Sequence, residues 1–272
     1  MIRLSRSILA GLAAALLVSA CETAPVTGRS QMMLISADEE RALGLQAFRQ
    51  VMSTEPVARG GSAAEMVERI GRRIAQAAEN PPPGLWQAPR FAWEFRTIEK
   101  NVPNAFCLPG GKVAVYTGIL PLTQNENGLA VVIGHEVAHA LARHGAERVS
   151  NQMAAQLGVA AASAAIAATA SGRTRTSLPL VMGALGAGAT VGVLLPMSRA
   201  QESEADRIGL ILAAIAGYDP REGVALWQRM KAAGEGRGRN AEWLSTHPAE
   251  DTRIQQIREW LPEAMRYYRP RG

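Results

Sequence analysis

Apolar residues spaced three and four apart predict individual helices, and an apolar content that is largely Ala, Val, Leu and Ile indicates a helix-rich protein. Ser36 to Glu39 has the composition of a capping box and opens a helix that we expect to run to about Met52. A second helix is expected from about Ser62 to Ala78, and the proline-rich stretch Asn80 to Gly84 ends it. Its predicted buried face consists of Ala63, Met66, Val67, Ile70, Ile74 and Ala77.

Two segments alternate apolar and polar residues, which predicts strands. Arg90 to Ile98 is the first, with an aromatic residue at every second position up to Phe95. Asn104 to Thr117 is the second, and Pro109-Gly110-Gly111 divides it into two halves joined by a tight turn. A small sheet of about three or four strands beside many helices predicts the α+β class, mainly helical.

Residues 153–197 consist largely of Ala, Gly, Val and Leu, and Gly172 to Arg175 divides them into two halves. Each half nearly reaches spanning length, so a pair of membrane helices is one interpretation. Alanine and glycine contribute little to membrane insertion, and the first half carries Gln156 and Ser163. We therefore expect an apolar helical hairpin that packs closely through its small residues.

His135-Glu136-Val137-Ala138-His139 follows the pattern HExxH, on a helix that we expect to run from a cap at Asn127 to about Val149. Histidines four residues apart project from one helix face, and neutral imidazole is a good zinc ligand. Glu136 lies next to the first histidine, where its carboxylate can take a proton from a water molecule at the metal. The pattern predicts a zinc site that hydrolyses peptide bonds; the alternative is a helix with ordinary polar residues.

A catalytic zinc site needs three protein ligands, and glutamates on a downstream helix are the natural source of the third. Glu202 and Asp206 lie one turn apart on one face of a helix that is expected to begin near Ser198. Glu202 can bind the metal while Asp206 accepts the second ring N–H of a ligand histidine. Spacing alone leaves Glu147 as an alternative third ligand.

Two other polar residues fit this site less well. His144 lies five residues beyond His139, about 140° around a straight helix, so it is expected to be structural. In the metzincin pattern a glycine three residues after the second histidine bends the chain, but here that position is Ala142. Glu204 points about 200° away from Glu202 on a straight helix.

The first twenty residues have the layout of a lipoprotein signal peptide. Arg3 and Arg6 form a basic region, Ile8 to Val18 forms a short apolar core, and Val18 to Cys21 fits the bacterial lipobox. The apolar run is shorter than the ~20 residues that a membrane span needs. We expect Cys21 to carry the lipid and residues 21–35 to form a tether; secretion without a lipid is the alternative. Glu22 favours the outer membrane over the inner membrane.

Charge and cysteine content narrow the function further. The chain of 272 residues has a formal charge of +5, and removing Arg3 and Arg6 leaves +3 (5 − 2). That excess is small and no nucleic-acid motif accompanies it, so no nucleic-acid partner is expected. A lipid on Cys21 would leave Cys107 without an intramolecular partner, so no disulfide is expected. Residues 36–272 are expected to form a single domain.

The ordered motifs together resemble peptidase family forty-eight of the gluzincins. This family includes the HtpX heat-shock protease, the CAAX prenyl proteases, a mitochondrial stress protease and periplasmic proteases, and the chain is closest to the lipoprotein or mitochondrial-type branch. The chain lacks the seven membrane helices of the prenyl proteases, so prenylated substrates are not expected. The motifs are Pro25 to Arg29, Asn104 to Phe106 with Pro109 to Gly111, His135 to His139, Ser198 and Arg199 with Glu202 to Asp206, and Thr246 to Pro248 with Arg253 and Ile254.

The resemblance implies a zincin-type fold and one zinc ion per chain, held by His135, His139 and Glu202, with Glu136 as the base. It implies that Asp206 supports a ligand histidine. In related periplasmic members a histidine before proline can occupy the fourth zinc position and keep the enzyme latent. His247 matches that position, as a latch or as a group that stabilises the transition state. The edge strand that pairs with extended substrate would include Asn104, Ala105, Phe106, Gly110, Gly111, Lys112 and Val113.

These features predict a lipid-anchored zinc endopeptidase of the bacterial periplasm that cleaves misfolded or misassembled envelope proteins. Its expected partners are those unfolded proteins, the membrane through the lipid, and the outer-membrane assembly machinery. The rival interpretation is a chaperone-like envelope lipoprotein that binds unfolded outer-membrane proteins with little proteolysis. A zinc-stabilised structural domain is disfavoured, because three ligands beside a glutamate leave an open metal position.

Overall fold

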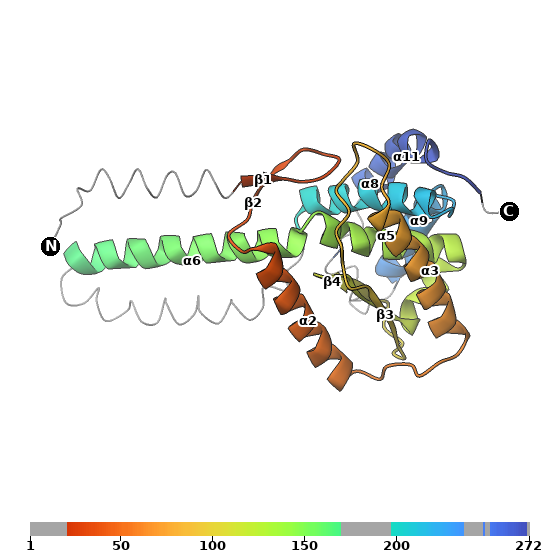
Figure 1. The fold of residues 1–272 in the computed structure, drawn as a ribbon, viewed down its shortest axis with the longest axis horizontal. Coiled ribbons are helices and arrows are strands. Elements are labelled where there is room, and N and C mark those ends of the chain that lie inside the picture. Colours follow the sequence, from red (N-terminus) through yellow and green to blue (C-terminus); the bar gives the residue numbers. More distant parts are fainter. Residues whose placement is uncertain (1–20, 170–196, 237–246, 248–250, 271–272) are drawn as a thin grey trace. The chain divides into compact units, whose positions relative to one another are not determined.

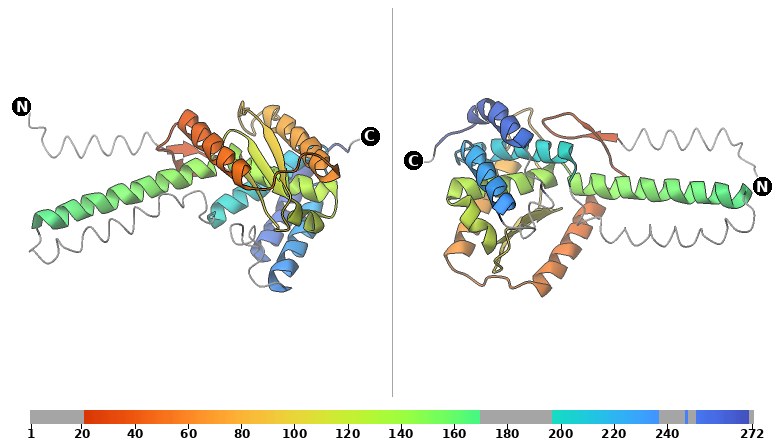
Figure 2. Two further views of the ribbon diagram at one scale, coloured as in Figure 1. Left: turned by 90° about the horizontal axis from the view of Figure 1, so that it is seen from below. Right: turned by 180° about the vertical axis from the view of Figure 1, so that it is seen from behind.

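A computed structural model describes residues 21–169, 197–236, 247 and 251–270 of the chain (Figures 1 and 2). The chain divides into a larger unit, residues 25–27, 37–145 and 195–272, and a smaller unit, residues 1–24, 28–36 and 146–194. The described elements are β1 (Cys21–Thr23), β2 (Ser30–Met32), α2 (Ala37–Thr54), α3 (Ser62–Glu79), β3 (Glu94–Ile98), β4 (Ala105–Leu108), β5 (Lys112–Tyr116), η1 (Thr117–Ile119), α4 (Leu120–Thr123), α5 (Glu126–Leu141), α6 (His144–Thr169), α8 (Arg199–Ile215), α9 (Glu222–Gly236) and α11 (Asp251–Met265).

The sheet of the larger unit has three strands in the order β3-β5-β4, which confirms the small sheet that the sequence predicts. β4 and β5 are antiparallel, with Leu108 opposite Lys112, and the turn between them uses Gly110 and Gly111 at φ values of 84° and 80°. Glycine suits this turn because residues with a Cβ rarely adopt positive φ. β3 runs parallel to β5, so the central strand is paired on both sides.

The two faces of the sheet are buried in two different cores. Val113 and Val115 on β5 belong to the main core, together with buried residues of α3, α5 and α8. Ala114 and Tyr116 point the other way and pack with Phe48 of α2. The alternation read from the sequence therefore corresponds to a sheet covered on both faces.

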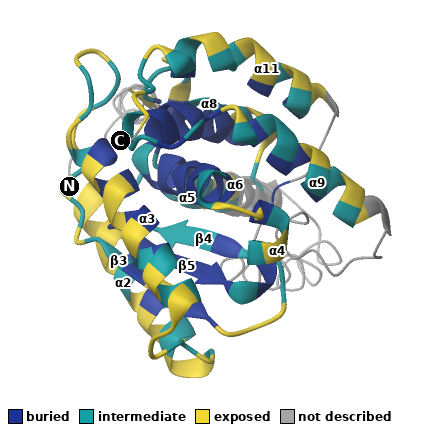
Figure 3. Ribbon diagram, turned by 90° about the vertical axis from the view of Figure 1, so that its right-hand side faces the viewer, coloured by how far each residue is buried: buried dark blue, intermediate teal, exposed yellow. Residues whose placement is uncertain are grey.

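α5 and α8 form the centre of the larger unit and are buried along most of their lengths (Figure 3). Two glycines allow the two helices to approach each other closely. A Cβ on Gly209 would lie 2.7 Å from the backbone nitrogen of His135, and a Cβ on Gly134 would lie 2.8 Å from the carbonyl oxygen of Gly209. α3, α9 and α11 pack around this pair.

The helix that carries HExxH differs at both ends from the prediction. Its cap is Asn125, whose side chain accepts a hydrogen bond from the Gly128 N–H, whereas Asn127 accepts from the backbone of Asp219. α5 stops at Leu141 instead of continuing to Val149. The bend follows at Arg143, which has φ of 57°, and α6 begins with the next residue. The side chain of this strained arginine donates a 2.8 Å hydrogen bond to Glu40 of α2.

The smaller unit contains part of the predicted tether. In this unit β1 and β2 form an antiparallel pair, Cys21–Thr23 with Ser30–Met32. Arg29 makes two hydrogen bonds of 2.5 and 2.7 Å to the carboxylate of Glu147 on α6, and the Leu34 N–H donates to Ser150 at 2.8 Å. α6 includes residues 153–169, the start of the predicted apolar hairpin. Residues 170–196 of that hairpin lie outside the described part. Within the described residues, no helix combines the length and the apolar character needed to cross a membrane.

Candidate metal centre

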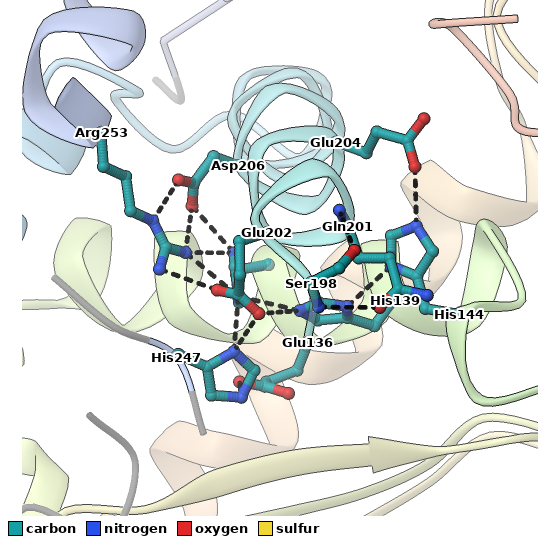
Figure 4. Close-up of polar contacts among 11 residues, drawn as sticks. Glu136, His139, His144, Ser198, Gln201, Glu202, Glu204, Asp206, His247 and Arg253 are labelled. Carbon is teal, nitrogen blue, oxygen red and sulfur yellow. Dashed lines mark hydrogen bonds and ion pairs between the residues drawn. The ribbon is translucent and has the colours of Figure 1, made fainter. Parts of the chain in front are cut away.

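Four potential metal ligands from three parts of the chain meet at one buried point. His135 and His139 come from α5, Glu202 comes from α8, and His247 lies ahead of α11 (Figure 4). Their ligand atoms all lie within 4.8 Å of one another. Ser198 caps α8 with a complete capping box, which fixes where that helix starts and hence where Glu202 points. The structure therefore brings together the three ligands that the sequence predicts and adds the predicted His247.

The spacing of the donor atoms fits a tetrahedral metal ion. The Nε2 atoms of His135 and His139 are 3.0 Å apart, and His247 Nδ1 is 3.2 Å from His135 Nε2. The Glu202 carboxylate lies 3.5 Å from His135 Nε2, 3.4 Å from His139 Nε2 and 2.8 Å from His247 Nδ1. Ligand atoms about 2.0–2.1 Å from a tetrahedral zinc ion stand about 3.3 Å apart. Imidazole nitrogens and a carboxylate at this separation are a suitable donor set for such an ion.

The protonation states also suit metal binding. Burial lowers the pKa of His139 well below its ordinary value, so the imidazole is neutral and keeps a lone pair. Burial alone would raise the pKa of Glu202, but its polar contacts with His139 and His247 and the positive charge of Arg253 lower it overall. The site therefore presents a neutral imidazole and an ionised carboxylate, which are the forms that bind zinc.

His135 is held from behind by a buried ion pair. Its Nδ1 is 2.9 Å from Asp206, as the sequence predicts. Arg253 of α11 contacts two of the three carboxylates of α8, with Nη1 2.7 Å from Glu202 and Nη2 2.9 Å from Asp206. Its guanidinium carbon also lies 3.5 Å from the centre of the Trp227 ring. Burial would raise the pKa of Asp206, but the charge of Arg253 and the hydrogen bond with His135 lower it, so the aspartate is ionised.

Sequence reasoning gave no role to Arg253. Arg253 belongs to the last motif of the resemblance, six residues after His247. The signal that could have identified it is a charged residue on an otherwise apolar helix face, in line with Ile257 and one turn before it. Arg253 is 4% exposed, and a charge buried to that degree needs partners of opposite charge.

His144 contacts the ring nitrogen of His139 that faces away from the other metal ligands. On a straight helix the two side chains would point about 140° apart. The two Nδ1 atoms are 2.8 Å apart because the bend at Arg143 redirects the chain after α5. His144 Nε2 is in turn 3.0 Å from Glu204 Oε2. The side chain of Thr27 donates a hydrogen bond to the other oxygen of Glu204. Figure 4 shows His144 and Glu204 on the side of the site opposite Arg253.

Glu136 and Glu147, the two remaining acidic candidates, differ in position. Glu136 is buried beside the metal ligands, with Oε1 3.7 Å from His247 Nε2. Glu147 belongs to the smaller unit, where it pairs with Arg29, and the four-residue group does not include it.

The predicted substrate-binding segment divides into an edge strand and a central strand. Lys112 and Val113 lie on β5, which β3 and β4 pair on both sides, so their placement on a free edge is wrong. β4 is an edge of the sheet and packs against α5. Burial and the charge of Glu136 raise the pKa of Cys107 on β4 well above its ordinary value. Asn104, Ala105 and Phe106 lie on or next to this edge, and Gly110 and Gly111 form the turn that follows it.

A helix with HExxH, a second helix that contributes a glutamate, and an edge strand beside the motif define a metallopeptidase of the zincin type. The chain belongs to Peptidase family M48, whose family model matches residues 62–261. It is a metalloendopeptidase, as are its similar relatives. The resemblance to this family that the sequence motifs show is thereby confirmed.

Proteins similar to this chain come from mitochondria and from bacteria. The mitochondrial metalloendopeptidase OMA1 of Schizosaccharomyces pombe is 37% identical over 246 residues, which cover 89% of this chain and 67% of the relative. Human mitochondrial metalloendopeptidase OMA1 is 30% identical over 256 residues, or 90% of this chain and 47% of the relative. The beta-barrel assembly-enhancing protease of Escherichia coli is 26% identical over 239 residues, or 87% of this chain and 47% of the relative. The chain spans about half the length of the last two proteins.

Proposed function

We propose that the chain is a zinc-dependent endopeptidase of the bacterial envelope that cleaves misfolded or misassembled proteins. The observation that carries this proposal is the group of His135, His139, Glu202 and His247 with Glu136 beside it. Zinc bound there would supply a Lewis acid that polarises the scissile carbonyl and activates water for attack. The donor set supports zinc as the metal, since two or three imidazoles with one carboxylate suit zinc.

Two residues of the chain transfer protons or position a ligand in this mechanism. Glu136, buried next to the first ligand, takes a proton from the attacking water and delivers it to the leaving amine. Asp206 holds His135 in the tautomer that leaves Nε2 free, since it accepts from Nδ1 at 2.9 Å. The low solvent exposure of the site strengthens both interactions.

His247 supports a latent resting state in this proposal. Its Nδ1 lies 2.8 Å from Glu202 and 3.2 Å from His135 Nε2, where a fourth ligand would stand. A ligand there occupies the position that substrate and water require, so cleavage needs His247 to move away. Replacing His247 with alanine should raise basal cleavage of an unfolded protein. A fall in cleavage at unchanged zinc content would instead assign His247 to transition-state stabilisation.

Substrate is proposed to pair with β4. The outer side of β3 is already bridged by residues 56–58, including a 2.8 Å hydrogen bond from the Ala58 N–H to Thr97. Among the described strands none pairs with the outer side of β4, so its main-chain groups are available to an extended peptide. Recognition through the main chain suits an enzyme that accepts many unfolded sequences.

The location in the envelope is proposed from the leader sequence and the relatives. Residues 1–20 would be removed as a signal peptide, Cys21 would carry the lipid, and residues 21–35 would connect it to the single protease domain of 36–272, with the apolar hairpin at 153–197. The outer membrane is favoured over the inner membrane. The name of the relative in Escherichia coli connects it with beta-barrel assembly, so misassembled outer-membrane proteins and their assembly machinery are the proposed partners here.

A Glu136→Gln variant tests the catalytic part of the proposal. Glutamine keeps the shape of the side chain but cannot act as the base, so the variant should bind one zinc ion per chain and lose cleavage of an unfolded outer-membrane protein. Cleavage by a zinc-loaded Glu136→Gln variant at the wild-type rate would refute the assignment. Chelation followed by zinc addition should remove and restore activity in the wild type.

A chaperone-like envelope lipoprotein is the second candidate function, because the open edge of β4 can hold an extended chain without cutting it. The Glu136→Gln variant separates the two functions in cells. Rescue of a strain with an envelope defect by this variant would favour holding over cleavage, and rescue by the wild type alone would favour cleavage.

A further inference from the structure

Behind His139 lies a chain of buried polar side chains to which the proposed function gives no role. His139 Nδ1 is 2.8 Å from His144 Nδ1, and His144 Nε2 is 3.0 Å from Glu204 Oε2. Thr27 donates to the second oxygen of Glu204, so the carboxylate is held at both oxygens. His144 is 0% exposed and Glu204 is 4% exposed, so these contacts are shielded from water.

When both histidines are neutral, only one arrangement of protons satisfies every contact from His139 through His144 to Glu204. A carboxylate accepts hydrogen bonds, so Glu204 requires a proton on His144 Nε2. A neutral His144 then has a lone pair on Nδ1, and the 2.8 Å contact requires a proton on Nδ1 of His139. His139 Nε2 is therefore free of a proton, and Nε2 is the atom that faces the other metal ligands.

The reverse arrangement would disable the site. If His144 donated its Nδ1 proton to His139, the proton of a neutral His139 would sit on Nε2 and block its lone pair. A lone pair on His144 Nε2 would then face the carboxylate of Glu204 at 3.0 Å, which is repulsive. Glu204 thus favours the tautomers in which His144 carries its proton on Nε2 and His139 carries its proton on Nδ1.

We propose that Glu204, acting through His144, is the positioning residue that fixes the tautomer and orientation of His139 for metal binding. This inference rests on the proposed zinc site and adds two residues, His144 and Glu204, to those that position its ligands. Asp206 does the same for His135 in one step, whereas His139 needs two steps because Glu204 lies on another face of α8. Partners of this kind typically contribute 10–100-fold to metal affinity.

Zinc affinity, measured on the full chain in detergent by competition with a chromophoric chelator, tests the proposal without reference to proteolysis. Glu204→Gln removes the charge that selects the tautomer, since an amide can turn either its oxygen or its NH₂ group toward His144. We expect zinc to bind about 10-fold or more weakly. Glu263→Gln is the matched control. Glu263 lies on α11 and pairs with Arg207, which is on the same helix as Glu204 but is not a metal ligand, so zinc affinity should not change.

Two substitutions of His144 separate proton acceptance from packing. His144→Leu fills the space but gives His139 no acceptor, so zinc affinity should fall as in Glu204→Gln. His144→Asn retains an acceptor oxygen near the position of Nδ1, so it should bind zinc more tightly than His144→Leu. Equal affinity of the leucine variant and the wild type would overturn the proposal, as would equal affinity of Glu204→Gln and the wild type. Circular dichroism of each variant identifies any that does not fold.

The tautomers themselves can be read from imidazole ¹⁵N chemical shifts in the metal-free wild type. The proposal requires a proton on Nδ1 of His139 and on Nε2 of His144, and the opposite assignment would overturn it whatever the variants do. His139→Ala distinguishes this inference from the proposed function. If His139→Ala binds zinc as tightly as the wild type, the metal site is wrong; if only His139→Ala loses zinc, the site stands and the role of Glu204 fails.

Discussion

Removal of the Arg253 charge is expected to destabilise the larger unit strongly. The guanidinium makes contacts with both Glu202 and Asp206 and stacks on Trp227, and the side chain is 4% exposed. Arg253→Met keeps much of the volume and apolar stem but leaves two buried carboxylates without their cation. Breaking a buried ion pair in this way costs about 3–5 kcal/mol. Loss of the contact with the ring adds to this, by up to about 2 kcal/mol where the site is desolvated.

The matched control lies on the same pair of helices. Arg207 of α8 makes two hydrogen bonds to Glu263 of α11, but their side chains are 30% and 19% exposed. Water screens such a pair, so Arg207→Met should cost only about 0.2–1 kcal/mol. Arg253→Lys should fall between the two, because lysine restores the charge but cannot reproduce the planar fork of contacts.

Urea unfolding followed by circular dichroism, with a chelator present in every sample, measures these differences without a contribution from bound metal. Because the whole unfolding free energy of a domain is about 5–15 kcal/mol, the Arg253→Met variant should show a large fall in the denaturation midpoint. If it loses no more stability than Arg207→Met at an unchanged slope, then Arg253 does not neutralise the two carboxylates and the reasoning from burial fails.

Three further predictions concern other parts of the larger unit. Gly209→Ala would place a Cβ 2.7 Å from the His135 backbone nitrogen, so we expect α5 and α8 to separate, with a loss of thermal stability and weaker zinc binding. Asn125→Ala removes the side chain that caps α5 through the Gly128 N–H and should cost about 0.5–2 kcal/mol in urea unfolding. Cys107, whose pKa burial raises well above its ordinary value, should react with iodoacetamide at pH 8 at least about tenfold more slowly in the folded than in the unfolded protein, as followed by mass spectrometry of its peptide.

Each of these predictions has a simple control. Gly145→Ala meets only the Pro109 ring at 3.8 Å, an ordinary contact, and alanine should leave stability unchanged or raise it slightly. Asn125→Ser retains a capping oxygen and should retain most of the stability lost in Asn125→Ala. Equal stability of Gly209→Ala and Gly145→Ala would contradict the close helix approach, and a fast-reacting Cys107 in the folded chain would contradict its packing against the main core.

Local patterns predicted those parts of the fold whose signals are contained in one element. α3 occurs where the spacing of its apolar residues placed it, within one residue at its end. The two faces of β5 and the turn at Gly110 and Gly111 also follow from alternation and from glycine at positive φ. The histidines of α5, and Glu202 with Asp206 on α8, could be selected because the two residues of each pair are four apart and share one helix face.

Features that depend on the meeting of distant elements could not be predicted in this way. Nothing in the sequence of Ala142 and Arg143 signals a helix end, because arginine is a good helix former and rarely adopts φ of 57°. A hydrogen bond to Glu40 of α2, a residue distant in sequence, holds the side chain of Arg143 at the bend, and the bend changes the direction in which His144 points. The strand order also depends on a parallel pairing of β3 with β5, so local alternation could not show that Lys112 lies on a central strand.

The geometry of α8 explains how one helix can serve both ligand histidines of α5. Glu202 faces the metal position, Asp206 lies one turn further on and reaches Nδ1 of His135, and Glu204 faces the side to which the bend brings His144. Asp206 has a short side chain, so its 2.9 Å contact requires the two helix backbones to be close. The glycine contact at Gly209 provides that approach, and a larger residue there would move all three carboxylates away from the histidines at once. The small residue in α8 is therefore as much a requirement of the metal centre as the acidic residues around it.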